Sequence, residues 1–313
     1  MPPVLVTGAT GRIGSELVRC LRQRGAPVRA LVHTPANASA LAAGGIEIVA
    51  GDFEEPASLD RAVAGVERVF LLSPPNPRQV ELQGNLVQAA RRAGVGHIVK
   101  VSALGASPDW PLPIPRWHWE TEQQIEQAGF AFTHLRPNYF MQMILTLSLE
   151  VIHSGTLSVP AGAGRVSMVD ARDIAVVAGA ALLEPGHAGR VYEITGPEAL
   201  SFGDVAQQLT EASGRPVKYV DVSPDTALAA LVAAGVPTWW AEYRVGVYRL
   251  YQEAGPDGWS ARVTTTVAEV GKQQPRRFSD FARDGLLSSA DSCDHARNRK
   301  LGRKPAGRIH AGG

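Results

Sequence analysis

The glycine-rich stretch VTGATGRIG (residues 6–14) constrains the fold of this 313-residue chain more than any other feature. It follows a short apolar run and opens a helical pattern, so it joins a first strand to a first helix. In such a turn Gly8 permits the tight bend, Gly11 lets the backbone approach a pyrophosphate, and Gly14 allows close helix–strand packing. Free N–H groups at the helix N-terminus favour phosphate as well. The G-x-x-G-x-x-G spacing therefore predicts a dinucleotide site.

Strand-like and helix-like segments alternate along the first half of the chain. Helical patterns at 15–25 and 79–94 have apolar residues at three- and four-residue spacing and close on a glycine. The expected strands are 4–8, 28–32, 46–50, 68–72 and 97–102, with two more at 132–136 and 190–195. This alternation predicts right-handed crossovers and a doubly wound parallel sheet, an α/β Rossmann fold. In that setting, a glycine-rich turn without a ligand becomes the less favoured alternative.

The second half of the chain loses this rhythm and predicts a smaller, mainly helical lobe. Helices are expected from near Asp170, at 201–214 and at 238–255. The expected division is an NAD(P)-binding Rossmann core (1–153), a substrate lobe with strands and a helix returning to the core (154–285), and a tail (286–313). From Asp291 onward the net charge is +4, which leaves −3 for the rest, and this composition predicts a basic, disordered tail.

Composition and charge argue against several classes of partner. The formal net charge is +1, so no global basic field attracts nucleic acid, and we expect no specific nucleic-acid partner. Apolar runs are too short to span a bilayer, and the N-terminus lacks a signal-peptide pattern. Two cysteines, Cys20 and Cys293, make no disulfide framework, which fits a reducing compartment. We expect a cytoplasmic protein with a small-molecule substrate, and a homodimer stays open.

The end of the second expected strand indicates which nicotinamide cofactor is bound. An acidic residue about 20 residues after the glycine loop holds the ribose 2′-hydroxyl of NAD, whereas basic residues accept the 2′-phosphate of NADP. Here the strand ends in LVHTP (31–35) and has no Asp or Glu. Arg12 lies inside the glycine loop and His33 at the strand end. This pattern favours NADP(H) over NAD(H).

Several ordered motifs give the chain a family resemblance over about residues 3–285. They are VTGATGRIG, ALVHTPANASAL, GDFEEPASLDRAVAGVERVFLLSP, HWETEQQIEQAG, HLRPNYFMQ and VGKQQPRRFSDFARD. With these motifs the chain resembles the NmrA-like branch of the atypical short-chain dehydrogenases. That branch includes NADPH-dependent quinone and dye reductases and also cofactor-binding regulators without known turnover. Relatives usually carry arginine at position 33, where this chain has histidine.

The resemblance implies where the cofactor would lie. Asp52 and Phe53 would border the adenine, residues 72–74 the central part of the cofactor, and residues 137–140 the nicotinamide end. Together with the glycine loop, the predicted cofactor-binding residues are Gly8, Thr10, Gly11, Arg12, Ile13, Gly14, His33, Asp52, Phe53, Leu72, Ser73, Pro74, Pro137, Asn138, Tyr139 and Phe140. Ser102 sits where reductases of this superfamily place a hydroxyl near the nicotinamide.

The stretch WHWETE (117–122) holds the remaining candidate residues. Many short-chain dehydrogenases use Tyr-x-x-x-Lys after the fifth strand, but between Ser102 and Phe130 there is no tyrosine or lysine. On a helix His118 and Glu122 share a face, so the carboxylate would orient the imidazole and raise its pKa. The alternatives are a structural His–Glu pair with packed tryptophans and a metal site. The metal site is disfavoured because no ligand spacing supports it.

These observations predict an NADPH-dependent oxidoreductase that passes hydride to a planar conjugated acceptor, either quinone-like or aromatic polyketide-like. The predicted catalytic residues are His118, Glu122 and Ser102, with no metal. Such an acceptor can take its proton from water because its developing anion is delocalised. An aromatic helix at 238–255, with Trp110 and Trp117, would supply a wall for a flat substrate. The alternative function is a non-catalytic, NADP(H)-sensing regulator of the NmrA type.

Overall fold

The computed structural model describes residues 1–285, so the predicted disordered tail lies outside the described residues. The strands are β1 (Val4–Val6), β2 (Val28–Val32), β3 (Glu47–Ala50), β4 (Arg68–Leu71), β5 (His97–Val101), β6 (Ala131–Pro137), β7 (Thr156–Ser158), β8 (Arg165–Val166), β9 (Arg190–Ile194), β10 (Leu200–Ser201) and β11 (Lys218–Val220). The helices are α1 (Arg12–Gln23), α2 (Ser39–Ala43), α3 (Pro56–Val63), α4 (Gln79–Ala93), α5 (Pro113–Gln127), α6 (Met141–Ser154), α7 (Ala171–Leu183), α8 (Phe202–Ser213), α9 (Pro224–Ala233), α10 (Thr238–Ala254) and α11 (Thr266–Glu269). Within residues 1–285 no helix is long and apolar enough to cross a membrane.

Seven parallel strands form the central sheet in the order β3-β2-β1-β4-β5-β6-β9. From β1 to β3 the strands extend the sheet to one side, and from β4 to β9 they extend it to the other. The strand order therefore reverses between β1 and β4. Ligands in such sheets bind beyond the carboxyl ends of the strands, at this switch point. The predicted doubly wound parallel sheet is confirmed.

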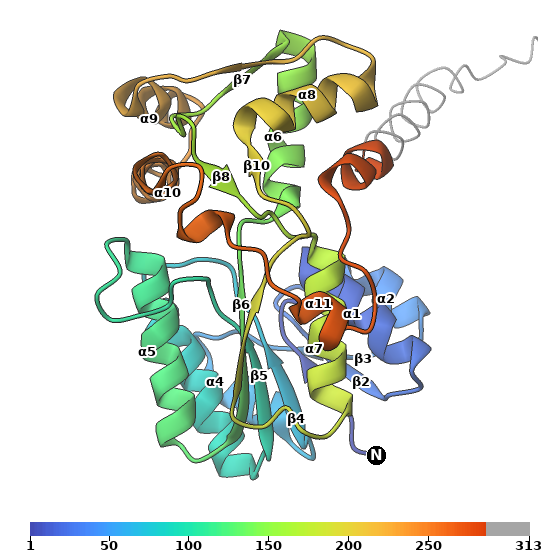
Figure 1. The fold of residues 1–313 in the computed structure, drawn as a ribbon. Helices are drawn as coiled ribbons and strands as arrows, with labels where there is room; N and C mark the ends of the chain where they lie inside the picture. The colour runs from blue at the N-terminus through green and yellow to red at the C-terminus, as the bar shows by residue number, and fades with distance from the viewer. Residues whose placement is uncertain (286–313) are drawn as a thin grey trace, which may run out of the picture.

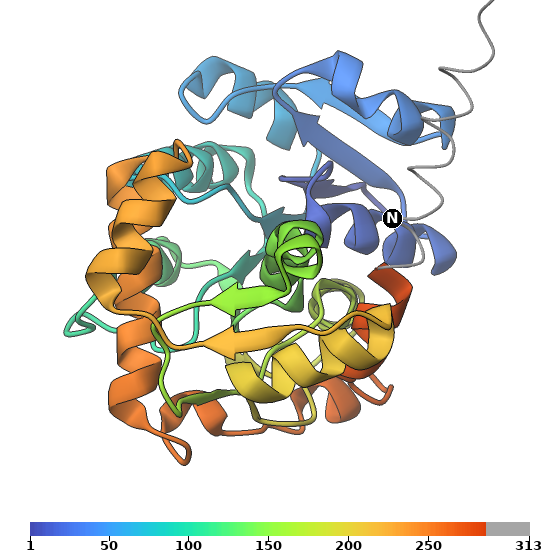
Figure 2. The same cartoon turned by 90° about the horizontal axis from the view of Figure 1, so that it is seen from above.

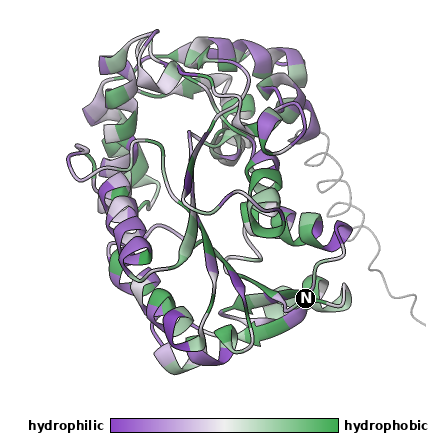
Figure 3. Cartoon of the chain, turned by 60° about the horizontal axis from the view of Figure 1, so that its bottom comes forward, coloured by the Kyte–Doolittle hydropathy of each residue, from purple (hydrophilic) through white to green (hydrophobic). Residues whose placement is uncertain are grey.

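Helices cover both faces of the sheet (Figure 1). Helices α1 and α7 pack together over one face, and α3, α4 and α5 cover the other. In Figure 3 hydrophobic residues concentrate along the strands and the inward sides of the helices. Each face is thereby sealed by its own apolar cluster, as a sheet of buried parallel strands requires.

Local sequence signals set the ends of several helices. Gly94 ends α4 in the left-handed conformation, with φ of 73°, which a residue without Cβ adopts at no steric cost. Asp170 caps α7 by accepting a hydrogen bond from the Arg172 N–H, as expected for a helix beginning there. Ser201 and Asp204 form a reciprocal capping box at the start of α8. The predicted helices near Asp170, at 201–214 and at 238–255 are confirmed.

A second lobe sits above the carboxyl ends of the strands (Figures 1 and 2). Its core joins side chains of α6, α8 and α10 with those of two small sheets, β10-β8 and β11-β7. Helix α6 contributes Met141 and Ile144 to this core, so the expected boundary after residue 153 falls at the far end of a lobe helix. Helix α7 and strand β9 return to the central sheet.

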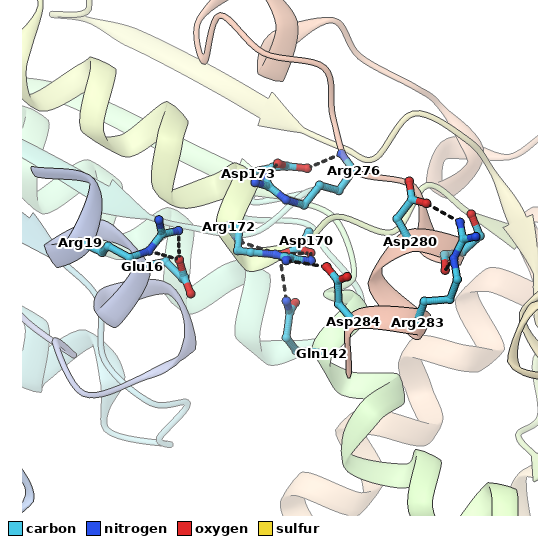
Figure 4. A network of polar contacts seen from close by, with 11 residues as sticks. Glu16, Arg19, Gln142, Asp170, Arg172, Asp173, Arg276, Asp280, Arg283 and Asp284 are labelled. Atoms are coloured by element: carbon cyan, nitrogen blue, oxygen red, sulfur yellow. Dashed lines mark hydrogen bonds and ion pairs between the residues drawn. The ribbon is translucent and has the colours of Figure 1, made fainter. Parts of the chain in front are cut away.

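The segment from 270 to 285 is fastened to the N-terminal end of α7 by two buried carboxylates (Figure 4). Asp173 accepts hydrogen bonds from the Arg276 backbone N–H at 2.8 Å and from Gln273 Nε2 at 3.0 Å, and it also pairs with the Arg276 guanidinium. Asp170 binds Arg172, which reaches Asp284 at 2.9 Å. The last described segment is therefore tied to the central core by polar contacts as well as by packing.

Asp173→Ala tests this attachment. Removing the carboxylate leaves the Arg276 N–H and the Gln273 amide without their acceptor in a buried place, so we expect a loss of about 2–3 kcal/mol in unfolding free energy. Asp280→Ala is the control, because Asp280 pairs with Arg283 where both side chains are more than half exposed; we expect a change within about 0.5 kcal/mol. Urea denaturation measures both, and equal effects would contradict this account.

Candidate active site

A cavity of about 600 Å³ opens at the carboxyl ends of β1, β4, β5 and β6, beneath the second lobe. It runs from the glycine loop after β1 to α10. Its lining residues are Gly8, Gly11, Arg12, Ile13, Leu72, Ser73, Pro74, Pro75, Ser102, Ala103, Leu104, Trp110, Leu112, Ile114, Pro115, His118, Pro137, Asn138, Tyr139, Phe140, Met143, Trp240, Tyr243, Arg244, Val247, Tyr248, Leu250, Tyr251 and Trp259. The cavity therefore lies at the switch point, where the topology predicts a ligand.

The glycine loop has the shape that a dinucleotide phosphate needs. Gly8 has φ of 62°, and a Cβ at Gly14 would lie 2.1 Å from the Gly8 carbonyl oxygen, so only glycine fits there. No side chain caps α1, which leaves its first N–H groups to a ligand. Thr7 Oγ1 fixes the loop to the end of β4 by donating to the Leu72 carbonyl at 2.7 Å and accepting from its N–H at 2.8 Å. This cradle fits a pyrophosphate.

Most of the predicted cofactor residues line this cavity. Gly8, Gly11, Arg12 and Ile13 come from the glycine loop and α1, and 72–74 and 137–140 come from the ends of β4 and β6. Thr10 and Gly14 lie in the loop without lining the cavity.

Asn138 is occupied by structural contacts. Its Nδ2 donates to Ser167 Oγ and to the Ser260 carbonyl, each at 2.9 Å, and its Oδ1 accepts from the Tyr139 N–H. It ties the end of β6 to the second lobe.

The residues predicted at the adenine end lie outside the cavity, at the ends of β2 and β3. His33 Nε2 lies 3.1 Å from Asp52 Oδ2, so the strand that follows brings a carboxylate to the tip of β2. Phe53 packs at the edge of the core, and its carbonyl accepts from Asn85 Nδ2. Arg12 points elsewhere and contacts Met143 Sδ of α6 at 3.8 Å. The two predicted ligands of a 2′-phosphate, Arg12 and His33, therefore have different neighbours.

The predicted pairing of His118 with Glu122 is wrong. Glu122 is buried and binds Arg136 of β6 through two hydrogen bonds, of 3.1 and 2.5 Å. Burial tends to raise the Glu122 pKa, but the bond to Arg136, together with His134, Ser102 and Lys100, outweighs burial and lowers the pKa. The pKa of His118 is lowered well below its usual value, by burial and by the nearby charge of Lys100. Glu122 shares a helical face with His118, but an arginine from the sheet captures its carboxylate.

Lys100 is the functional candidate that the sequence analysis missed. It lies in the middle of β5, fully buried, with Nζ 2.7 Å from His118 Nδ1. Burial lowers its pKa to about 7, although the charge of Glu122 partly opposes this. Strands that are covered on both faces are normally apolar, so the lysine within HIVKV could have indicated a buried amine with a special role.

The contacts of His118 define its tautomer. When Lys100 is charged, its Nζ and Gln79 Nε2, at 2.7 and 3.3 Å from Nδ1, are both donors, so Nδ1 accepts. The ring proton then sits on Nε2. His118 is half-buried and lines the cavity. A neutral imidazole backed by an amine can thus present an N–H donor to a bound molecule.

Ser102 directly follows β5, two residues after Lys100, so the two side chains lie on the same face of the sheet. Its hydroxyl is buried and lies close enough to the Glu122 carboxylate to help lower the pKa of that group, but it makes no hydrogen bond of good geometry to any described residue. It lines the same cavity as His118. A buried hydroxyl left without such a hydrogen bond at a cavity wall suits a bound polar group.

Aromatic rings form the far wall of the cavity. From α10, Trp240 stacks on Tyr243 with ring centroids 5.3 Å apart, and Trp110 meets Trp259 edge-on at 4.9 Å. Five of the expected wall residues line the cavity: Trp110, Trp240, Tyr243, Tyr248 and Tyr251. Trp117 and Trp239 do not line it but lie near each other, with centroids 6.4 Å apart. Tyr139 and Trp259 complete the wall.

Comparisons with known proteins identify the family. The model of the NmrA-like family matches residues 2–282, so the chain belongs to this family. An NAD(P)H azoreductase of Xenophilus azovorans is 42% identical over 280 residues, which cover 90% of this chain and 96% of that relative. The NADPH complex of an NADPH-dependent quinone oxidoreductase from Escherichia coli has a TM-score of 0.82 at 29% identity, covering 89% of this chain and 98% of that one. The triphenylmethane reductase of Citrobacter sp., complexed with NADP(H), has a TM-score of 0.81 at 28% identity, covering 90% and 99%.

Lys100→Met tests the state of the buried amine. Because the folded-state pKa of Lys100, about 7, lies below the value of 10.5 that it has when exposed, the unfolded chain binds more protons between these values. The wild type should therefore gain stability relative to Lys100→Met as the pH rises from 7 to 9.5, with little relative change below 7. Denaturation at several pH values measures this, with Lys218→Met, at an exposed lysine of β11, as the control. A stability difference that stays constant across this range would contradict the assignment.

Proposed function

We propose that this NmrA-like protein is an NADPH-dependent oxidoreductase that passes a hydride to a flat, conjugated acceptor such as a quinone or an aromatic polyketide-like compound. One observation carries the proposal. A continuous cavity joins a phosphate-binding glycine loop to a wall of aromatic rings. The compared relatives, named as an azoreductase, a quinone oxidoreductase and a triphenylmethane reductase, support an acceptor of this kind.

The cofactor would lie across the strand ends, and when bound it supplies the hydride. Gly11 and the N-terminus of α1 would hold the pyrophosphate, 72–74 would border the central part, and 137–140 would form the nicotinamide end. The lack of an acidic residue in LVHTP and the cofactors named for the two solved structures support the choice of NADPH. Arg12, which here contacts Met143, would turn to the 2′-phosphate. Asp52 acts against this choice because its carboxylate would repel a 2′-phosphate at the tip of β2.

His118 would supply a proton to the reduced acceptor. Hydride transfer to a quinone leaves negative charge on its oxygen, and the His118 Nε2–H is the donor at the cavity wall. As Nε2 gives up its proton, Nδ1 takes one from the Lys100 ammonium. The ring is then left neutral in its other tautomer, and Lys100 is left uncharged. Ser102 would offer a second hydrogen bond to the same oxygen.

The missing tyrosine–lysine pair and the aromatic wall of the cavity both support this class of acceptor. No tyrosine–lysine pair follows β5 within 103–129, so the acid that short-chain dehydrogenases commonly use on simple ketones is not in its usual place. A quinone anion is delocalised and requires less assistance. Aromatic faces match a planar ring system by stacking.

The alternative, a regulator that only binds NADP(H), would need the glycine loop alone. The aromatic half of the cavity favours an enzyme, because a cofactor sensor needs no room for an acceptor. The predicted basic tail, which a regulator could use to bind a partner, lies outside the described residues.

Cofactor choice gives the first test of the function. Purified protein should oxidise NADPH steadily with a panel of quinones and bind NADPH more tightly than NADH. Arg12→Ala should narrow that preference by about 1.5–3 kcal/mol through loss of a charge-assisted contact. Arg19→Ala is the control, since Arg19 is exposed on the same helix and pairs with Glu16. Equal wild-type affinities would refute the NADPH assignment, and tight binding without turnover would favour the sensor.

The role of His118 can be separated from packing. His118→Ala should lower kcat about 10- to 100-fold while cofactor affinity and Tm change little. Because the relay needs a charged Lys100, wild-type kcat/KM should fall as the pH rises through about 7, and the variant should lose this dependence. A structural role would instead reduce stability by about 1–3 kcal/mol. A kcat loss of about four decades with the fold intact would indicate an essential acid and an ordinary carbonyl substrate.

A further inference from the structure

The charged side chains that line the cavity, among the described residues, are all positive. Its lining contains two arginines, Arg12 and Arg244, and none of the described residues that line it is an aspartate or glutamate. Arg12 belongs to α1 beside the glycine loop, whereas Arg244 belongs to α10 in the second lobe. In both views α10 lies across the strand ends from α1 (Figures 1 and 2). Arg244 therefore lines the cavity from the second lobe, on a different element from the one that carries the glycine loop.

Arg244 has no ion partner among the described residues, unlike three other half-buried arginines of the chain. Arg136, Arg172 and Arg276 each pair with a buried carboxylate. For Arg244, which is also half-buried, no hydrogen bond or ion pair joins its side chain to any residue among 1–285. Burial raises the pKa of the Tyr139 hydroxyl, and the charge of Arg244 partly offsets this rise, so the guanidinium lies near that wall.

A guanidinium in these surroundings favours a particular ligand. Removing part of its hydration costs free energy that a carboxylate of the protein usually offsets, and among residues 1–285 no carboxylate pairs with Arg244. Its planar donors match the oxygens of a carboxylate or sulfonate by paired hydrogen bonds. On the same helix Trp240, Tyr243 and Tyr248 line the cavity and supply ring faces for the rest of the ligand.

We propose that the acceptor is an aromatic compound bearing an anionic group, a carboxylate or a sulfonate, which Arg244 binds while the aromatic wall holds the rings. The proposal rests on the proposed function and specifies its substrate class. Arg244 is a specificity-determining residue in it, and the hydride and proton steps are unchanged.

Redox-inert ligands test this independently of turnover. Isothermal titration of the NADP⁺-saturated protein with naphthalene-2-sulfonate and with neutral 2-naphthol compares the same ring system with and without the anion. The wild type should prefer the sulfonate. Arg244→Gln should weaken sulfonate binding about tenfold or more and leave 2-naphthol nearly unchanged, and Arg244→Lys should recover part of the loss. Arg249→Gln is the matched control, because it removes the same charge from α10 at an exposed site, 3.8 Å from Glu253.

Kinetics with 1,4-naphthoquinone and its 2-sulfonate add a second measurement. The kcat/KM for the sulfonate divided by that for the parent quinone should be about tenfold lower in Arg244→Gln than in the wild type. Because the variant is compared with the wild type, the different reactivities of the two quinones cancel. Equal wild-type affinity for the two naphthalenes would overturn the proposal even if no variant folds. So would a variant that weakens NADP⁺ binding and leaves the sulfonate preference intact. If no quinone is reduced but the sulfonate preference depends on Arg244, the proposed function fails while the anion site stands.

Discussion

All seven strands of the central sheet run in the same direction, and the other features of the site depend on this arrangement. Because the strands are parallel, each loop that follows a strand emerges at one edge, where residues distant in the sequence meet. The glycine loop, 72–75, Ser102 and 137–140 are separated by tens of residues but line one cavity. At the switch point Thr7 hydrogen-bonds the end of β4, so the loop that would hold phosphate is braced by the neighbouring strand.

Parallel strands covered on both faces are normally apolar, and the departure from this rule lies beside the cavity. Between the sheet and α5 the structure buries Lys100, Glu122 and His134, with Arg136 half-buried next to them. Such groups are costly to bury unless paired, so each carboxylate or amine constrains its neighbours. Glu122 neutralises Arg136, which leaves Lys100 to face His118. Because the Glu122–Arg136 ion pair occupies that carboxylate, the His118 ring contacts Lys100 instead. This contact determines which imidazole nitrogen carries the proton.

The second lobe completes the site by closing one side of it. Its aromatic helix, α10, contributes rings at helical spacing, and only those on one side line the cavity. Trp239 contacts Trp240 and Trp117 instead, away from the ligand space. The lobe is held close to the strand ends by Asn138, which bonds Ser167 and Ser260. Substrate-facing groups and cofactor-facing groups thus come from different parts of the chain.

Much of this protein could be predicted from local patterns alone. The glycine spacing, the alternation of apolar runs and the capping residues Asp170 and Ser201 act over a few residues, so the sequence by itself determined the seven strands of the central sheet, several helices and the glycine-rich turn. The partner of His118 was not predictable in this way. Helical spacing favoured Glu122, four residues away, but the tertiary structure places Arg136 against that carboxylate and Lys100 against the ring. The same holds for Arg244, because only the packing of the lobe over the strand ends shows that no residue among 1–285 pairs with it. Contacts between distant segments depend on how sheet, helix and lobe pack, and a buried charge takes the nearest opposite charge in space, not in sequence.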